Sequence, residues 1–319
     1  MTRHASEARR DRASEASAPG GASRGGEGRR EAPRDPAPGR GRHRTLAPSA
    51  PEGGTARGDG AARPVPNDRK FVTALCRGLE VLRAFGAGDR QLGNQEIAQR
   101  TGLPKPTVSR LTYTLTRLGY LRQLPSDGRY AVGAAVLGLG LSSLGQMDVR
   151  RIARPLMQAL AEHTHGSVNL GIRDQLGMIY IDTYRQAASY TVQLDVGSRV
   201  PLATSSMGRA WLAAAPERQR RAVLEELRAT EPARFAELRR GIEQALRDYE
   251  ELGFCASVGE WRREVNAVAA PLAAPDGGEI LVFSCSGAPF QFGRETLETE
   301  IGPRLVTLVG NVRSALAAR

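Results

Sequence analysis

Long apolar stretches and cysteine are what this 319-residue sequence lacks most clearly. It has no run of about 18 apolar residues, the length that a membrane-spanning helix requires. Its first residues are polar and rich in arginine, without the apolar segment of a secretory signal. The three cysteines, Cys76, Cys255 and Cys285, are odd in number and widely spaced, which argues against a disulfide framework. We therefore expect a cytoplasmic protein with no membrane partner.

Lysine is also scarce, because only Lys70 and Lys105 occur and every other basic residue except histidine is arginine. This bias is typical of a GC-rich genome. The net charge is nevertheless +11, which predicts either a polyanionic partner or an unstructured basic tail. Residues 67–132 carry 11 basic and 5 acidic side chains, whereas residues 133–319 carry 21 of each. The positive charge therefore belongs to the N-terminal part of the chain.

Residues 1–67 contain almost no large apolar side chains and consist mainly of Gly, Pro, Ser, Ala and Arg. Such a segment cannot bury enough apolar surface to offset the entropy lost on ordering. The sequence therefore predicts a disordered basic tail. As a DNA-binding arm it would add affinity without specificity. The alternatives are a solvated tail without function and a start codon assigned too early.

The pattern over residues 68–132 predicts a DNA-binding domain. Apolar residues at helical spacing predict a helix over about 71–85, a second over Asn94–Arg100, and a third from the Pro104–Pro106 region to Leu118. Two β-prone segments, 120–124 and 129–132, flank a Pro/Asp/Gly turn and predict a hairpin. The order helix, helix, tight turn, helix, hairpin is that of a winged helix-turn-helix.

The third of these helices would read DNA. When Val108, Leu111, Leu115 and Leu118 face the core, its polar side chains point outward. Arg and Lys can bind guanine edges or phosphates, and hydroxyl groups suit phosphates. The alternative is a solvated face of a small helical bundle, which the net charge of the segment disfavours. The predicted DNA-binding residues are Lys105, Thr107, Ser109, Arg110, Tyr113, Arg117, Arg122 and Arg129.

The sequence pattern predicts a helical linker over residues 133–147. It predicts an effector-binding and oligomerisation domain over residues 148–319. In the latter, helical patterns alternate with short strands, among them Tyr190–Leu194, and two strand pairs flank the turns at 174–177 and 275–278. Hairpins packed with helices imply a mainly antiparallel sheet. The expected fold class is α+β, with the winged helix-turn-helix at the N-terminal side.

Several segments, in the expected order, resemble the IclR family of bacterial transcriptional regulators. They are Gly102–Leu111, Gly197–Thr204, Met207–Ala210, Gly253–Cys255, Val268–Pro271 and Ser284–Gly287. The resemblance covers about residues 68–319. It implies a GAF-like effector domain that binds a small, often carboxylate-bearing metabolite.

The residues themselves allow an anion site. Thr204–Ser206 precede an apolar helix, and free N–H groups at a helix start attract anions. Ser284 and Ser286 alternate on one strand and share a face, although serine is also an ordinary residue of a sheet. The resemblance supports a ligand-binding role. The predicted effector-binding residues are Thr204, Ser205, Ser206, Met207, Gly208, Ser257, Trp261, Ala267, Ser284 and Ser286.

Two positions depart from some members of the family. Ser257 stands where they have Asp, and Ala267 stands where they have Cys. The expected pocket is therefore less polar and poorer by one negative charge. This disfavours the smallest keto acids as ligands. Glu260 and Trp261 would instead line a pocket for a larger acid, aromatic or derived from a sugar.

The sequence thus predicts a ligand-responsive repressor or activator of a catabolic operon, with no cofactor and no metal. A single module reads few base pairs, so a homodimer or dimer of dimers on double-stranded operator DNA is expected. The alternative is a serine hydrolase-like domain fused to a DNA-binding module, although no Gly-x-Ser-x-Gly motif occurs. A third possibility, a DNA-architectural protein without ligand, leaves the large neutral C-terminal part unexplained.

Overall fold

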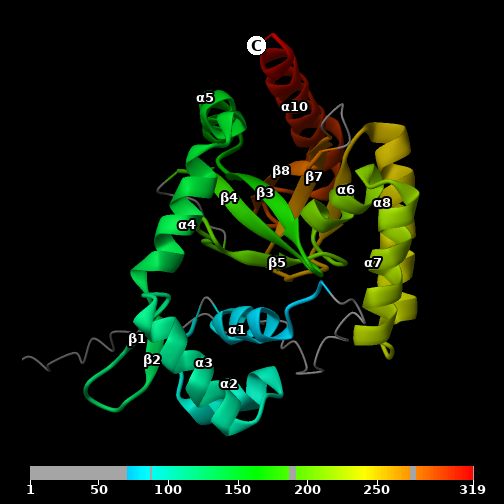
Figure 1. The fold of residues 1–319 in the computed structure, drawn as a ribbon. Coiled ribbons are helices and arrows are strands. Elements are labelled where there is room, and N and C mark those ends of the chain that lie inside the picture. Colours follow the sequence, from blue (N-terminus) through cyan, green and yellow to red (C-terminus); the bar gives the residue numbers. More distant parts are fainter. Residues whose placement is uncertain (1–69, 87, 187–191, 274–277, 319) are drawn as a thin grey trace, which may run out of the picture. The chain divides into compact units, whose positions relative to one another are not determined.

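The computed structural model describes residues 70–86, 88–186, 192–273 and 278–318 (Figure 1). The tail predicted over residues 1–67 lies outside the described residues. Among the described residues, no helix is both long and apolar enough to cross a membrane.

The first described elements form a small helical unit with a hairpin. They are α1 (Thr73–Arg83), α2 (Asn94–Thr101), α3 (Lys105–Arg117), β1 (Leu121–Gln123) and β2 (Tyr130–Val132). Val81, Ile97 and Val108 are fully buried between the helices. Helix α2 begins after Gly93, whose N–H donates to the Glu96 carboxylate at 2.7 Å. It ends at Gly102, whose φ of +68° favours glycine.

The predicted third helix is one residue shorter than its apolar pattern. Leu118, expected to face the core, caps the helix and is 62% exposed. Thr112, which the apolar pattern does not include, is fully buried. Its hydroxyl can be buried because it donates to the carbonyl oxygen of Val108 at 3.0 Å.

Helices α4 (Ala134–Gly145) and α5 (Asp148–Thr164) follow the hairpin. They lead into a sheet of six described antiparallel strands in the order β5-β4-β3-β8-β7-β6. The strands are β3 (Ser167–Asp174), β4 (Gly177–Arg185), β5 (Arg199–Pro201), β6 (Cys255–Val258), β7 (Asn266–Leu272) and β8 (Leu281–Gly287). The remaining helices are α6 (Ser206–Ala214), α7 (Glu217–Thr230), α8 (Phe235–Leu252), α9 (Arg294–Thr296) and α10 (Gly302–Ala317), with a π-helical turn over Leu297–Ile301.

The two faces of this sheet support separate cores. On one face, α5 and α10 pack over Val168, Leu170 and Phe283. On the other, α6 and α8 pack over Met178 and Val282, and Figure 1 shows α7 beside α8. The sheet therefore has an apolar core on each face, which is typical of a sheet covered by helices on both sides.

A β-bulge in β4 decides which side chains reach the α6 face. Leu170 pairs with Asp182 and Gly171 with Tyr180, so Ile181 is the extra residue. Tyr180 consequently faces α6, whereas Asp182 lies on the other face beside Arg150 of α5, at 3.4 Å. Without the bulge, the period of two would place both on one face.

One predicted strand is wrong among the described residues. Of the segment Tyr190–Leu194, the described residues 192–194 are not in a strand, and the edge strand is β5 instead. The carbonyl oxygen of Leu194 accepts a hydrogen bond from the Arg185 guanidinium at 3.0 Å, so a side chain takes the place of a ladder partner. The strand β6 was not predicted from the sequence.

Candidate DNA interface and ligand cavity

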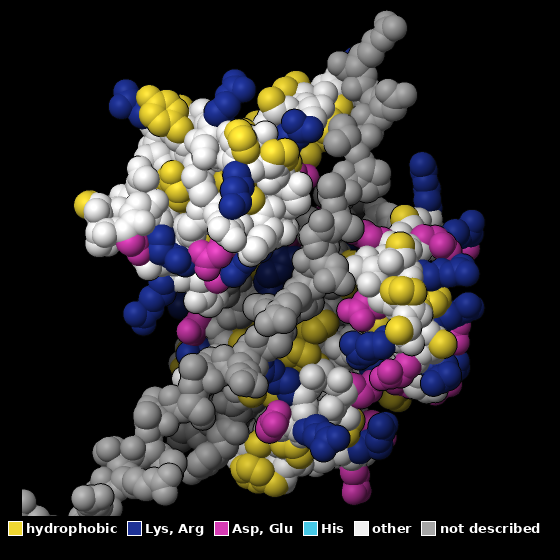
Figure 2. All heavy atoms as spheres, turned by 90° about the horizontal axis from the view of Figure 1, so that it is seen from below, with side chains coloured by type: hydrophobic (Ala, Val, Ile, Leu, Met, Phe, Trp, Pro, Cys, Tyr) yellow, Lys and Arg dark blue, Asp and Glu magenta, His cyan; other side chains and the backbone are white. Residues whose placement is uncertain are grey.

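The outward face of α3 carries the predicted reading residues. Ser109, Arg110, Tyr113 and Arg117 are exposed, and Tyr113 is 67% exposed. Arg110, Tyr113 and Arg117 follow the i, i+3, i+7 spacing of one helix face, opposite the buried Val108. This face offers cationic and hydroxyl donors without a packing partner in the described unit. Basic side chains are interspersed with apolar and acidic ones on the face seen in Figure 2.

Two of the predicted contacts on α3, Ser109 and Lys105, already have partners within the unit. Ser109 accepts a hydrogen bond from the Asn94 side chain at 3.0 Å. The Lys105 ammonium group lies 3.4 Å from Oε1 of the Gln95 side chain and remains exposed. Thr107 is half-buried, and Arg122 is exposed on β1. Some of the predicted DNA-binding side chains are therefore exposed on the surface, whereas others form hydrogen bonds within the unit.

Arg129 belongs to the second kind. Its Nη2 donates to Glu96 Oε2 at 2.6 Å and to the Gln91 carbonyl oxygen at 3.3 Å. The Gly93 N–H and then the Arg129 guanidinium lower the pKa of Glu96. These contacts fasten the hairpin to the start of α2. In this arrangement Arg129 positions the hairpin, and it has fewer donors available for DNA than Arg122.

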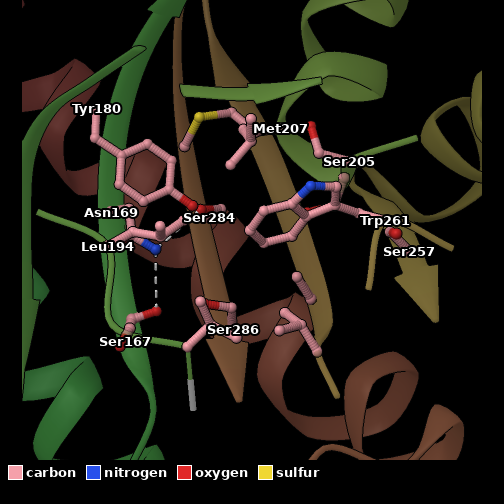
Figure 3. Close-up of a pocket in the computed structure, with 15 residues that line it drawn as sticks. Ser167, Asn169, Tyr180, Leu194, Ser205, Met207, Ser257, Trp261, Ser284 and Ser286 are labelled. Carbon is pink, nitrogen blue, oxygen red and sulfur yellow. Dashed lines mark hydrogen bonds between the residues drawn. The ribbon is translucent and has the colours of Figure 1, made fainter. Parts of the chain in front are cut away.

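In the α/β domain, one cavity collects most of the predicted effector-binding residues. It opens to solvent and has a volume of about 30 Å³. The cavity is therefore narrow. Its lining is Ser167, Asn169, Tyr180, Val192, Leu194, Val200, Ser205, Ser206, Met207, Ser257, Trp261, Val265, Ala267, Ser284 and Ser286. Figure 3 shows the Tyr180 and Trp261 rings on opposite sides of it.

Helix α6 forms one end of the cavity. Ser205 caps the helix, accepting a hydrogen bond from the Gly208 N–H at 3.1 Å and donating to the Pro201 carbonyl oxygen at 2.6 Å. Ser206 and Met207 form the first turn, whose N–H groups have no carbonyl partner within the helix. The Ser257 hydroxyl donates to the Thr204 carbonyl oxygen at 2.8 Å. This end thus combines a fixed cap with backbone donors that have no partner within the helix.

The sheet forms the other polar surface. The Asn169 amide lies 3.4 Å from Ser284 Oγ, and Tyr180 is hydrogen-bonded to Ser284 as well. Burial raises the pKa of the Tyr180 phenol, so the group stays neutral at physiological pH. Ser167 Oγ is buried without a hydrogen-bond partner among the described residues. An unsatisfied buried hydroxyl is costly, and here it faces a cavity.

Three residues that were expected at the pocket do not line the cavity. Thr204 contributes only its carbonyl oxygen to Ser257. Gly208 allows the close approach of the preceding loop, because a Cβ there would lie 2.1 Å from the Leu202 carbonyl oxygen. Glu260, expected beside Trp261 in the pocket, instead pairs with Arg209 outside the lining.

Asn169 and Tyr180 are lining residues that sequence reasoning did not identify. For Asn169, the signal in the sequence was its polar side chain within the apolar run from Val168 to Ile172. Their place beside Ser284 depends on the pairing of β3 with β8 and on the β4 bulge. Neither feature can be read from spacing along one strand.

The cavity provides binding groups and no acid–base pair. Among the described lining residues none is His, Asp, Glu, Lys or Arg, so no side chain there could take a proton from a serine. His163 pairs with Glu300 and His165 with Gln186, both elsewhere. In the described part of the chain, no cluster of His, Cys, Asp and Glu could hold a metal ion.

A helix-turn-helix unit with a donor-lined face, followed by a domain with a neutral cavity, defines a ligand-responsive transcriptional regulator. The comparisons agree. The IclR helix-turn-helix domain matches residues 74–125, and the C-terminal domain of the bacterial transcriptional regulator IclR matches residues 141–309. The chain belongs to the IclR family and is not an enzyme.

Individual relatives support the same assignment. The HTH-type transcriptional regulator TsaQ1/TsaQ2 of Comamonas testosteroni is 36% identical over 250 residues, 78% of this chain and 90% of the relative. The Pca regulon regulatory protein of Pseudomonas putida is 29% identical over 75% of this chain and 82% of its own length. The crystal structure of an IclR family regulator from Brucella abortus is 49% identical, with a TM-score of 0.74 over 82% of this chain and 98% of that chain.

Proposed function

We propose that this regulator controls a catabolic operon in the cytoplasm and senses an organic acid with a flat apolar body. The observation that carries the proposal is the uncharged cavity between Tyr180 and Trp261. N–H groups at the start of α6, which have no partner within the helix, favour an anionic group at that end. The two rings favour a planar body.

The neutral lining sets the class of acid. With no cation in the described lining, a carboxylate would be held by hydroxyl and N–H donors alone. Ser257 and Ala267 add no charge, which supports the expectation that the smallest keto acids are poor ligands. Ser167 Oγ, at the sheet end, offers a partner for a second polar group of the ligand.

Isothermal titration with benzoate, 4-hydroxybenzoate, a sugar acid and pyruvate tests this class. An IclR homolog from Microbacterium hydrocarbonoxydans was crystallised with 4-hydroxybenzoate, so that acid belongs in the panel. We expect benzoate or 4-hydroxybenzoate, which have a flat apolar ring, to bind more tightly than the sugar acid or pyruvate. Replacing Ser284 and Ser286 with Ala should weaken binding without changing DNA affinity in the absence of ligand. Binding of pyruvate alone would refute the proposed class.

We also propose that the protein binds its operator as a homodimer or a dimer of dimers. Leu137, Leu139 and Leu141 on α4 are each about 60% exposed, and Leu75 on α1 is 62% exposed. Exposed leucines at such density are typical of an interface. Light scattering with and without operator DNA gives the stoichiometry, and a monomer bound to a single half-site would refute it.

A further inference from the structure

A buried arginine lies directly behind the cavity. Arg209 of α6 is 4% exposed, and its guanidinium contacts three segments of the domain. Nε donates to the Ala203 carbonyl oxygen at 3.0 Å, in the loop that leads into α6. Nη1 donates to the Ala256 carbonyl oxygen of β6 at 3.4 Å and to Glu260 Oε1 at 2.8 Å, and Nη2 pairs with Glu260 Oε2. A bidentate pair of this kind fixes direction as well as distance.

Glu260 is the neighbour of Trp261 in the β6–β7 loop. This loop supplies Trp261 and Val265 to the cavity wall. Gly259, with a φ of +68°, turns the chain into the loop, and its N–H lies 3.3 Å from the Val265 carbonyl oxygen. Beyond this local closure, the Arg209–Glu260 pair ties the loop to α6. The same helix contributes Ser206 and Met207 to the lining of the cavity.

The guanidinium of Arg209 fits against helix α8 because Gly241 has no side chain there. A Cβ at Gly241 would lie 2.3 Å from Arg209 Nη2 and 3.5 Å from Glu260 Oε2. Glycine within a helix costs about 1 kcal/mol relative to alanine. A glycine at this position thus costs helix stability, but it avoids a collision with the Arg209–Glu260 pair.

We propose that Arg209 and Glu260 are positioning residues that hold Trp261 as a wall of the cavity and so limit the size of the effector. Neither side chain lines the cavity. They act through Trp261, by fixing the loop that carries it against the helix that carries the anion-binding end. The claim that the pair limits effector size rests on the proposed function. The claim that the pair fixes the position of Trp261 does not depend on it.

The first experiment therefore needs no ligand. The chain has two tryptophans, so Trp211→Phe leaves Trp261 as the single indole fluorophore. In this background we compare Glu260→Ala and Gly241→Ala with a control, Glu243→Ala. Glu243 forms an ion pair with Arg239 at 2.7 Å on the surface of α8, and its side chain is 45% exposed, against 43% for Glu260.

We expect the emission of Trp261 to shift to longer wavelength in Glu260→Ala and Gly241→Ala, and its quenching by acrylamide to rise about twofold or more. The control should behave as the parent, because an exposed helical pair contributes little. Gly241→Ala is the stringent variant, since it keeps both charged partners and improves helix propensity. Unchanged quenching in both variants, with native circular dichroism, would overturn the proposal.

The second experiment compares benzoate with the larger 1-naphthoate. The parent should prefer benzoate. In both variants the Kd of benzoate should rise about two- to fivefold, and the preference over 1-naphthoate should shrink. If the indole becomes accessible while that preference is kept, the role in size selection is refuted. If the parent binds neither acid, the proposed effector class fails, and the quenching experiment still decides the position of Trp261.

Discussion

The two arginines Arg110 and Arg129 provide a sharp test of how this regulator reads DNA. Both were predicted from sequence to bind DNA, yet their surroundings differ. Arg110 is exposed on α3, whereas Arg129 is held by Glu96 at 2.6 Å and by the Gln91 carbonyl oxygen at 3.3 Å. We expect Arg110→Ala to weaken operator binding directly, and Arg129→Ala to act through the stability of the hairpin.

The magnitudes follow from the kind of contact. If Arg110 binds a base edge, its loss costs about 1–3 kcal/mol for each module, which is about 5- to 150-fold in Kd. If it binds a phosphate, binding falls on every sequence alike, and the slope of log K against log salt drops by about 1. For Arg129→Ala we expect a lower Tm of the DNA-binding unit. At a temperature where both variants are folded, its change in Kd should be smaller than that of Arg110→Ala.

Fluorescence anisotropy on operator and shuffled DNA, across a salt series, separates these outcomes. Circular dichroism at the same temperature establishes that each variant is folded. Arg122→Ala, at an exposed position of the same hairpin, is the control for the Tm measurement alone, because Arg122 is itself a predicted DNA contact. The reasoning would be refuted if Arg129→Ala, fully folded, lost as much affinity as Arg110→Ala, or if Arg110→Ala lost none.

The remaining predictions concern the α/β domain. Burial raises the pKa of both Cys255 and Cys285 to about 12, so alkylation of the native protein at pH 8 should modify Cys76 alone. Above pH 9 the unfolded thiols lose protons that the native ones keep, so stability should fall as pH rises towards 12, and less steeply in Cys285→Ala. Gly208→Ala should lower stability by about 1–3 kcal/mol in urea, because its Cβ meets the Leu202 backbone; a wild-type midpoint would contradict this.

The element order of the DNA-binding unit could be read from the sequence. Val108, Leu111 and Leu115 repeat at helical spacing, and glycines and prolines mark where helices end, as at Gly102 and Pro104. These are local properties of the backbone and of one helix face. The end of α3 could not be read in this way, because the apolar pattern continues to Leu118 whereas the helix ends at Arg117.

Part of the cavity was also accessible from sequence. Ser284 and Ser286 share a face by the period of a strand, and Ser205–Met207 lie at a helix start, so their chemistry could be anticipated. Ser257 and Trp261 followed from the family resemblance. Positions along the chain could not show that these groups meet in one cavity.

Only the tertiary structure decided which groups meet. The β4 bulge turns Tyr180 towards Asn169 and Ser284, and a shift of one residue would have turned it away. Glu260 was expected in the pocket, and its pairing with Arg209 depends on a helix 51 residues earlier in the chain. Sequence periodicity determines which face of an element is apolar. The register between strands, and the partner of a buried charge, depend on packing between segments that are distant in the chain.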